Sequence, residues 1–149
     1  MTRMQKMLAS DAPAAVILIR IMVGGVFLSE GIQKFLFPDA LGVGRFTKIG
    51  IPAPEILAPF VGVCEIVCGL LFLLGLLTRW AAVPLIANML VAITTTKIPI
   101  LLKSGFWAMA HESRTDFAML LGSLFLLIAG AGPWSLDARL GRTARKDNA

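Results

Sequence analysis

The sequence has little of the side-chain chemistry that holds metals and cofactors. Its 149 residues contain no tyrosine and a single histidine, His111. No set of histidine, cysteine, aspartate and glutamate residues has the spacing of metal ligands. A Ser-His-Asp arrangement, a glycine-rich phosphate loop and a dinucleotide fingerprint are also missing. We therefore expect no zinc or haem site, and no motif specifies a reaction mechanism.

Cysteine is almost absent as well. The two cysteines, Cys64 and Cys68, lie four positions apart in an apolar run. Side chains at this spacing on a helix have Cβ atoms about 5–6 Å apart, whereas a disulfide needs about 3.5–4.5 Å. We predict free thiols that pack as small apolar groups, and not the CxxC pair of dithiol redox proteins.

Charged residues are scarce too, at 15% of the chain, whereas 57% of the residues are hydrophobic. This composition is too apolar for a soluble domain of this length. Continuous apolar runs, in place of alternating ones, indicate helices and not a barrel. Four runs approach the roughly 20 residues that a helix needs to cross a bilayer, at residues 13–37, 55–77, 81–102 and 116–132. The sequence predicts an all-α polytopic membrane protein, a four-transmembrane-helix bundle that forms one domain over residues 1–149.

The segments between these runs complete the expected architecture. Arg3 and Lys6 precede the first run as in a signal peptide, but its length and the charge within it favour a retained helix. The glycine-rich segment 39–50 predicts a short interfacial helix between the first two spans. Thr78 and Arg79 form a tight turn before the third span, and residues 94–99 (TTTKIP) weaken its end. Residues 138–149 form a basic tail.

The distribution of basic residues predicts how the protein is oriented in the membrane. Four spans place both termini on one side of the membrane, and the basic cluster at residues 139–146 favours the cytoplasmic side of a bacterial-type inner membrane. The net charge of +5 is explained by a basic tail beside an anionic leaflet, so no nucleic acid is needed as a partner. The bilayer is the expected partner, and the sequence leaves homo-oligomer formation open.

Two charges interrupt the apolar runs, Arg20 in the first and Glu65 in the second. A charge near mid-bilayer costs at least about 2.5–3.5 kcal/mol on insertion scales, so it normally faces the protein interior and has a partner. Because these charges are opposite and lie on adjacent spans, we expect them to form a buried ion pair. The pair is either a purely structural contact or the polar end of a ligand pocket.

Helical periodicity groups further residues with these charges. Small residues near each charge, Gly24, Gly62 and Gly69, predict close approach of the first two helices. The candidate walls of a pocket are Phe27, Phe72, Gly24, Gly62 and Gly69, with the two phenylalanines as its flat apolar surfaces. Its entrance is expected near Lys34 and Asp116, which stand at the ends of the first and fourth spans.

Several of these segments resemble the DoxX family of membrane proteins. Residues 18–34 (LIRIMVGGVFLSEGIQK) are similar to the family's opening helix. Residues 50–53 (GIPA) and 62–81 (GVCEIVCGLLFLLGLLTRWA) are similar to its second helix and the threonine-arginine turn. The similarity continues through Asp116 to residues 132–137 (GPWSLD).

The resemblance implies a four-helix inner-membrane protein of a redox system, either quinone-linked oxidation of sulfur compounds or a complex for thiol and oxidative stress. It implies quinone as a candidate cofactor and a soluble or membrane redox partner. It assigns no catalytic residue. The residues leave two other functions open, a non-catalytic assembly or scaffold subunit and a transporter of a small solute.

Overall fold

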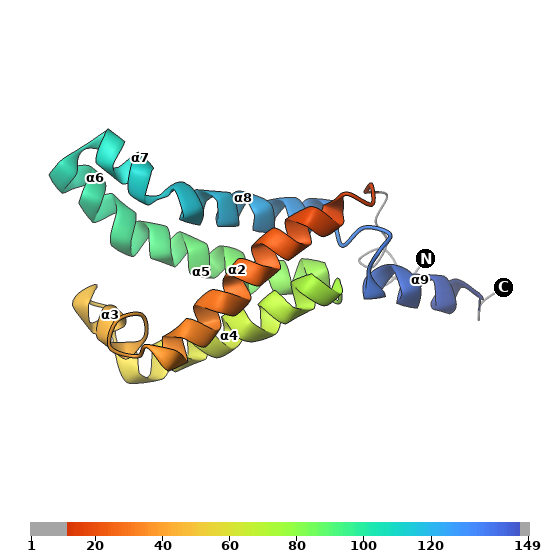
Figure 1. The fold of residues 1–149 in the computed structure, drawn as a ribbon, viewed down its shortest axis with the longest axis horizontal. Helices are drawn as coiled ribbons and strands as arrows, with labels where there is room; N and C mark the ends of the chain where they lie inside the picture. The colour runs from red at the N-terminus through yellow and green to blue at the C-terminus, as the bar shows by residue number, and fades with distance from the viewer. Residues whose placement is uncertain (1–11, 147–149) are drawn as a thin grey trace.

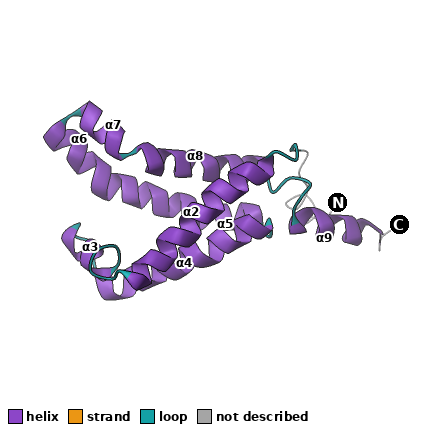
Figure 2. Ribbon diagram, in the orientation of Figure 1, coloured by secondary structure: helices purple, strands orange, loops and turns teal. Residues whose placement is uncertain are grey.

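A computed structural model of the protein describes residues 12–146. Within them the chain forms helices and connecting loops, without strands (Figures 1 and 2). The elements are α2 (Val16–Leu36), α3 (Val43–Lys48), α4 (Pro54–Leu74), α5 (Thr78–Ala92), the π-helix η1 (Ile93–Lys97), α6 (Ile98–Ser104), α7 (Phe106–Glu112), α8 (Arg114–Ala129) and α9 (Leu136–Lys146). The predicted all-helical membrane fold is confirmed. Arg3, Lys6 and residues 147–149, used above for topology and the tail, lie outside the described residues.

Three helices of the described chain are long and apolar enough to cross a membrane. They are Val16–Leu36, Pro54–Leu74 and Thr78–Ser104, the last formed by α5, η1 and α6 together. The run at residues 116–132 gives a shorter helix, because α8 has 16 residues and ends at Ala129, before Gly130. The fourth span therefore stays a prediction.

The helices α2 and α4 pack against each other through glycines. A Cβ atom at Gly69 would lie 2.8 Å from the backbone nitrogen of Leu28, and one at Gly24 would lie 2.9 Å from the carbonyl oxygen of Gly69. Gly31 faces Gly62 in the same way, with 2.7 Å between a Cβ at Gly31 and the carbonyl oxygen of Gly62. The prediction that Gly24 and Gly62 lie at the contact of the first two helices is confirmed. Such contacts hold membrane helices together where lipid removes the hydrophobic driving force.

The second helix pair is formed by α5 and α8, and the two pairs share one core. Phe27, Phe72, Leu85 and Leu126, one from each long helix, are fully buried. Figure 1 shows the pairs close together near α9 and further apart at the opposite end, where α3 and the α6–α7 hairpin lie. We call these the α9 end and the α3 end of the bundle.

The third span changes its helical form at the predicted weak point but does not end there. Pro99 has no N–H group to donate to the preceding turn. The hydroxyl groups of Thr94, Thr95 and Thr96 donate to the carbonyl oxygens of residues 90–92, within 2.6–2.9 Å. Carbonyls engaged in this way bond less well along the helix. The result is the π-helical turn η1, after which the helix continues as α6.

Two short helices flank the bundle. α3 lies within the segment 39–50, where the sequence predicts a short helix. α9 occupies residues that the sequence treats only as a basic tail. Its start is fixed by the loop before it, since Asp137 and Ser135 bond to that loop and to the preceding turns.

The glycine contact between α2 and α4 gives a first prediction. Gly69→Ala should lower the free energy of unfolding by about 1–3 kcal/mol, because the new methyl group would overlap the backbone of α2 and force the helices apart. Gly25→Ala is the matched control, because a Cβ there meets no atom within 4 Å. The measurement is unfolding in detergent mixtures followed by circular dichroism. Equal stability of the two variants would contradict the close contact.

Candidate functional site

Arg20 bonds to backbone carbonyls at the α9 end of the bundle. Its side chain is buried, with 2% of the residue exposed. Nε donates to the carbonyl oxygen of Phe72 at 2.8 Å, and Nη2 donates to that of Leu73 at 2.6 Å. Nη1 donates to the carbonyl oxygens of Trp134 at 2.6 Å and Ala131 at 3.2 Å.

These bonds supply hydrogen-bond donors that the end of a helix lacks. The last carbonyls of a helix have no donor within the helix and carry partial negative charge. A buried guanidinium supplies both the donors and the positive charge to the end of α4. The same guanidinium holds the loop between α8 and α9, so Arg20 joins three segments of the chain.

Asp137 completes this junction from the other side. Its backbone N–H donates to the carbonyl oxygen of Gly75 at 2.9 Å. Its carboxylate accepts from the N–H groups of Leu77 at 2.7 Å and Thr78 at 3.1 Å, at the start of α5. Leu77 has a φ of 48°, which costs a non-glycine residue roughly 1–2 kcal/mol. The carboxylate stabilises that turn, and Arg79 adds a 3.0 Å bond to the carbonyl oxygen of Ile128.

The expected ion pair between Arg20 and Glu65 is wrong. The carboxylate of Glu65 accepts from Lys34 and from Asn88, and among residues 12–146 the guanidinium of Arg20 donates to carbonyl oxygens only. The antiparallel register of α2 and α4 explains the error. Gly24 faces Gly69 and Gly31 faces Gly62, so the numbers of facing residues add to 93 in both cases. Arg20 therefore faces position 73 and Glu65 faces position 28, eight residues or about 12 Å apart along the helix.

Glu65 instead forms a three-helix cluster with Lys34 and Asn88. Lys34 Nζ lies 2.5 Å from Oε2 of Glu65, and Asn88 Nδ2 lies 2.7 Å from Oε1. The side chains of Glu65 and Lys34 are only 4% and 11% exposed. Each carboxylate oxygen thus has a donor from a different helix, α2 or α5, as a buried charge requires.

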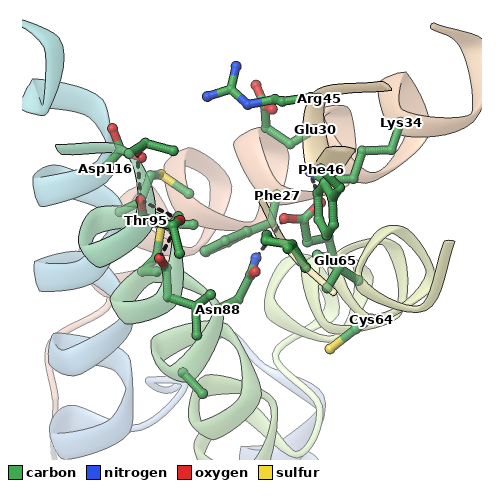
Figure 3. Close-up of a pocket in the computed structure, with 18 of the residues that line it drawn as sticks. Phe27, Glu30, Lys34, Arg45, Phe46, Cys64, Glu65, Asn88, Thr95 and Asp116 are labelled. Carbon is green, nitrogen blue, oxygen red and sulfur yellow. Dashed lines mark hydrogen bonds and ion pairs between the residues drawn. The ribbon is translucent and has the colours of Figure 1, made fainter. Parts of the chain in front are cut away.

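This cluster borders a cavity of about 680 Å³ between the two helix pairs (Figure 3). The lining comes from α2, α3, α4, α5, η1 and the first residues of α8 and is mostly apolar. Figure 3 shows Glu65 and Asn88 pointing toward one another, with Phe27 and Phe46 beside them. Volume and lining are typical of a small-molecule site.

A second ion pair lies further along the cavity, where η1 meets α8. Lys97 Nζ is 3.1 Å from a carboxylate oxygen of Asp116, and both residues line the cavity. Lys97 is the last residue of the π-helical turn and is buried. Because π-helical turns are frequent at functional sites, this placement adds weight to the cavity as the site.

The predicted site residues divide between the cavity and the packing contacts. Glu65, Lys34, Asp116 and Phe27 line the cavity. Phe72 is buried in the core beside Arg20, and neither lines the cavity. Gly24, Gly62 and Gly69 provide the helix contact, and Thr78 and Arg79 belong to the junction with Asp137.

Sequence reasoning missed Asn88 and Lys97. Asn88 is an amide within an apolar run, and a polar residue inside a span is a signal for function. Lys97 was assigned to the weak end of the third span, because the π-helical turn that carries it inward leaves no mark in the hydrophobic pattern.

The two cysteines are not joined by a disulfide in the part of the chain that the structure describes. Cys64 lines the cavity, Cys68 is buried, and both are free thiols, as the spacing predicts. Among residues 12–146, no group of three or more histidine, cysteine, aspartate or glutamate residues is placed to hold a metal ion.

Fold and site together define an integral membrane protein built of helices, with buried charges beside an apolar cavity inside the bundle. The sequence model of the DoxX family matches residues 15–98, more than half of the chain, and the protein belongs to this family. It is 57% identical over 145 residues to the uncharacterized membrane protein Rv3486 of Mycobacterium tuberculosis. That alignment covers 93% of this chain and 89% of the relative. No solved structure matches the chain.

The cluster at Glu65 gives a second prediction. Lys34→Met should lower the free energy of unfolding by about 3–5 kcal/mol, because it leaves a carboxylate buried without its ionic partner. The double variant Lys34→Met/Glu65→Gln should lose less than the sum of the two single losses. Lys103→Met, at an exposed position of α6, is the control and should change stability by less than about 0.5 kcal/mol. Additive losses in the cycle would show that the two side chains are not coupled.

The junction at Arg20 gives a third prediction. Arg20→Met should destabilise the protein by at least about 3 kcal/mol, because four buried or partly buried carbonyls lose a charged donor and each one left unpaired costs about 1–3 kcal/mol. Arg20→Lys should recover only part of the loss, since an ammonium group lacks the planar fork. Unfolding in detergent mixtures measures both. Wild-type stability of Arg20→Met would contradict the role of the junction.

Proposed function

We propose that this DoxX-family protein is a component of a membrane redox system and that its cavity binds the head group of a quinone-like molecule. The observation that carries the proposal is the cavity of about 680 Å³ with the cluster of Lys34, Glu65 and Asn88 on its wall. The redox role is the one that the family resemblance implies. A bound quinone would supply the electron-accepting chemistry that the side chains lack.

The cavity suits a flat, mostly apolar ring with a few polar atoms. Phe27, Phe46 and Met119 offer apolar surface, while Asn88 and Thr95 offer polar atoms. The charges of Lys34 and Glu65 neutralise each other, so the site does not require a charged ligand. An alkyl tail would extend between the two helix pairs toward the lipid.

The closed α9 end favours binding over conduction of a solute. The guanidinium of Arg20 and the carboxylate of Asp137 fasten α4, α5 and the loop before α9 to one another there. The cavity lies among the α2, α3 and η1 residues toward the other end. A small-solute transporter would need a path past this junction. A non-catalytic scaffold would need no cavity with a polar cluster.

The location of the protein is part of the proposal. We place it in a bacterial-type inner membrane with both termini in the cytoplasm. The support is the basic character of α9, whose sequence includes Arg139 and Arg142 next to the closed end of the bundle. A soluble or membrane redox partner would exchange electrons with the bound molecule.

A binding experiment tests the function. Purified protein in lipid nanodiscs should bind decylubiquinone, and Glu65→Gln should weaken binding about tenfold, or about 1.4 kcal/mol, because the anchor of Lys34 and Asn88 is lost. Glu55→Gln is the matched control on the same helix, since Glu55 is exposed and lies outside the cavity lining. The control should bind as the wild type does.

Two results would overturn the proposal. If folded Glu65→Gln and Lys34→Met both keep the wild-type affinity, the molecule binds elsewhere. If the wild-type protein does not bind decylubiquinone at all, the scaffold function becomes the better explanation of the buried charges.

A further inference from the structure

The amide of Asn88 has its orientation fixed by chemistry. Nδ2 donates to Oε1 of Glu65 at 2.7 Å. The reverse orientation would place the amide oxygen against the carboxylate, where two acceptors would repel each other. The amide oxygen therefore points away from Glu65. This oxygen has no hydrogen-bond partner among the described residues. It is not among the fully buried unpaired atoms, so part of it is accessible.

Two threonines on the same wall also present acceptors. The hydroxyl of Thr95 donates to the carbonyl oxygen of Val91 at 2.7 Å, and that of Thr96 donates to the carbonyl oxygen of Ala92 at 2.6 Å. A hydroxyl has one hydrogen, so these two oxygens have only lone pairs left for the cavity that they line. We call Asn88, Thr95 and Thr96 the acceptor wall.

The basic side chains of the cavity are ion-paired or lie elsewhere. Lys34 binds Glu65 and Lys97 binds Asp116, and because their side chains are only 11% and 10% exposed, little of either ammonium group faces the cavity. Arg45 lies on α3, away from Asn88 in Figure 3. The polar atoms that the acceptor wall offers to a ligand are therefore unpaired acceptors.

A quinone and its reduced form differ in this respect. The two oxygens of a quinone are acceptors, whereas each hydroxyl of a quinol donates one hydrogen bond. A site with unpaired acceptors discriminates strongly against an analogue that lacks the matching donor. We infer that the acceptor wall selects uncharged head groups that carry hydroxyl donors, so the cavity binds the quinol form in preference to the quinone. The inference rests on the proposed function and names the form of the molecule that the site holds.

The test compares three forms of one probe with the wild-type protein in nanodiscs under anaerobic conditions. They are decylubiquinol, decylubiquinone and the dimethyl ether of decylubiquinol, which keeps the aromatic ring but has no donor. We expect decylubiquinol to bind at least about tenfold more tightly than either of the others, a factor that corresponds to about 1.4 kcal/mol. Equilibrium binding of the three compounds is the measurement.

Two variants test whether the acceptor wall causes the preference for quinol over quinone. Asn88→Leu should reduce the ratio of quinol to quinone affinity toward one, because the amide oxygen is replaced by a methyl group of similar size. Thr95→Val, which keeps the shape of the side chain, is the second variant and should lower the ratio in the same direction. Met89→Leu is the control, since it conserves volume on the same lining without adding or removing a strong acceptor. It should keep the wild-type ratio.

The outcomes separate the two proposals. Equal affinity of the wild type for the three forms, or tighter binding of the quinone, would overturn the selection of hydroxyl donors and leave the proposed binding function standing. A preference for quinol that persists in both Asn88→Leu and Thr95→Val would overturn the role of the wall. Failure of the wild type to bind any of the three compounds would overturn both proposals.

Discussion

The contact of α2 with α4 through glycine is the constraint on which the other contacts depend. With Gly24 against Gly69 and Gly31 against Gly62, the two backbones approach so closely that a methyl group cannot enter between them. This contact fixes the antiparallel register, and the register decides which polar groups meet. Arg20 is brought to the end of α4, whereas Glu65 is left within reach of Lys34. One steric contact thereby separates two charges that composition alone would pair.

The two ends of the bundle serve different purposes as a result. At the α9 end the polar groups bond to backbone atoms: Arg20 binds carbonyls and Asp137 binds N–H groups. Such bonds join helix ends and loops and leave few polar groups that a ligand could reach. Toward the α3 end the polar groups bond to other side chains, across α2, α4 and α5, and a cavity lies beside them. The π-helical turn η1 contributes Lys97 and two threonines to that cavity.

The sequence predicted the helices, the glycine contact and the burial of Arg20 and Glu65. These features follow from local periodicity and from the high cost of placing a charge in the membrane. Lys34, Glu65 and Asp116 line the cavity, and their part in ligand binding stays a prediction. The pairing of Arg20 was wrong because register depends on backbone contacts that the pattern of apolar residues does not encode. Phe72 was misplaced for the same reason. Asn88 was missed because a single amide changes the hydrophobic pattern very little.

The junction at Arg20 also has a consequence for how the protein is made. Arg20 belongs to α2, the first helix of the described residues, but Ala131 and Trp134, which accept two of its bonds, follow 111 and 114 residues later. Chains fold from the N-terminus as they are synthesised. The guanidinium therefore enters the membrane before its last two acceptors exist, and α2 cannot reach its final state until the loop before α9 has been made. A nascent chain arrested before residue 131 carries an incompletely bonded charge in the bilayer, which marks it as unfinished to any quality-control protease that recognises such a defect.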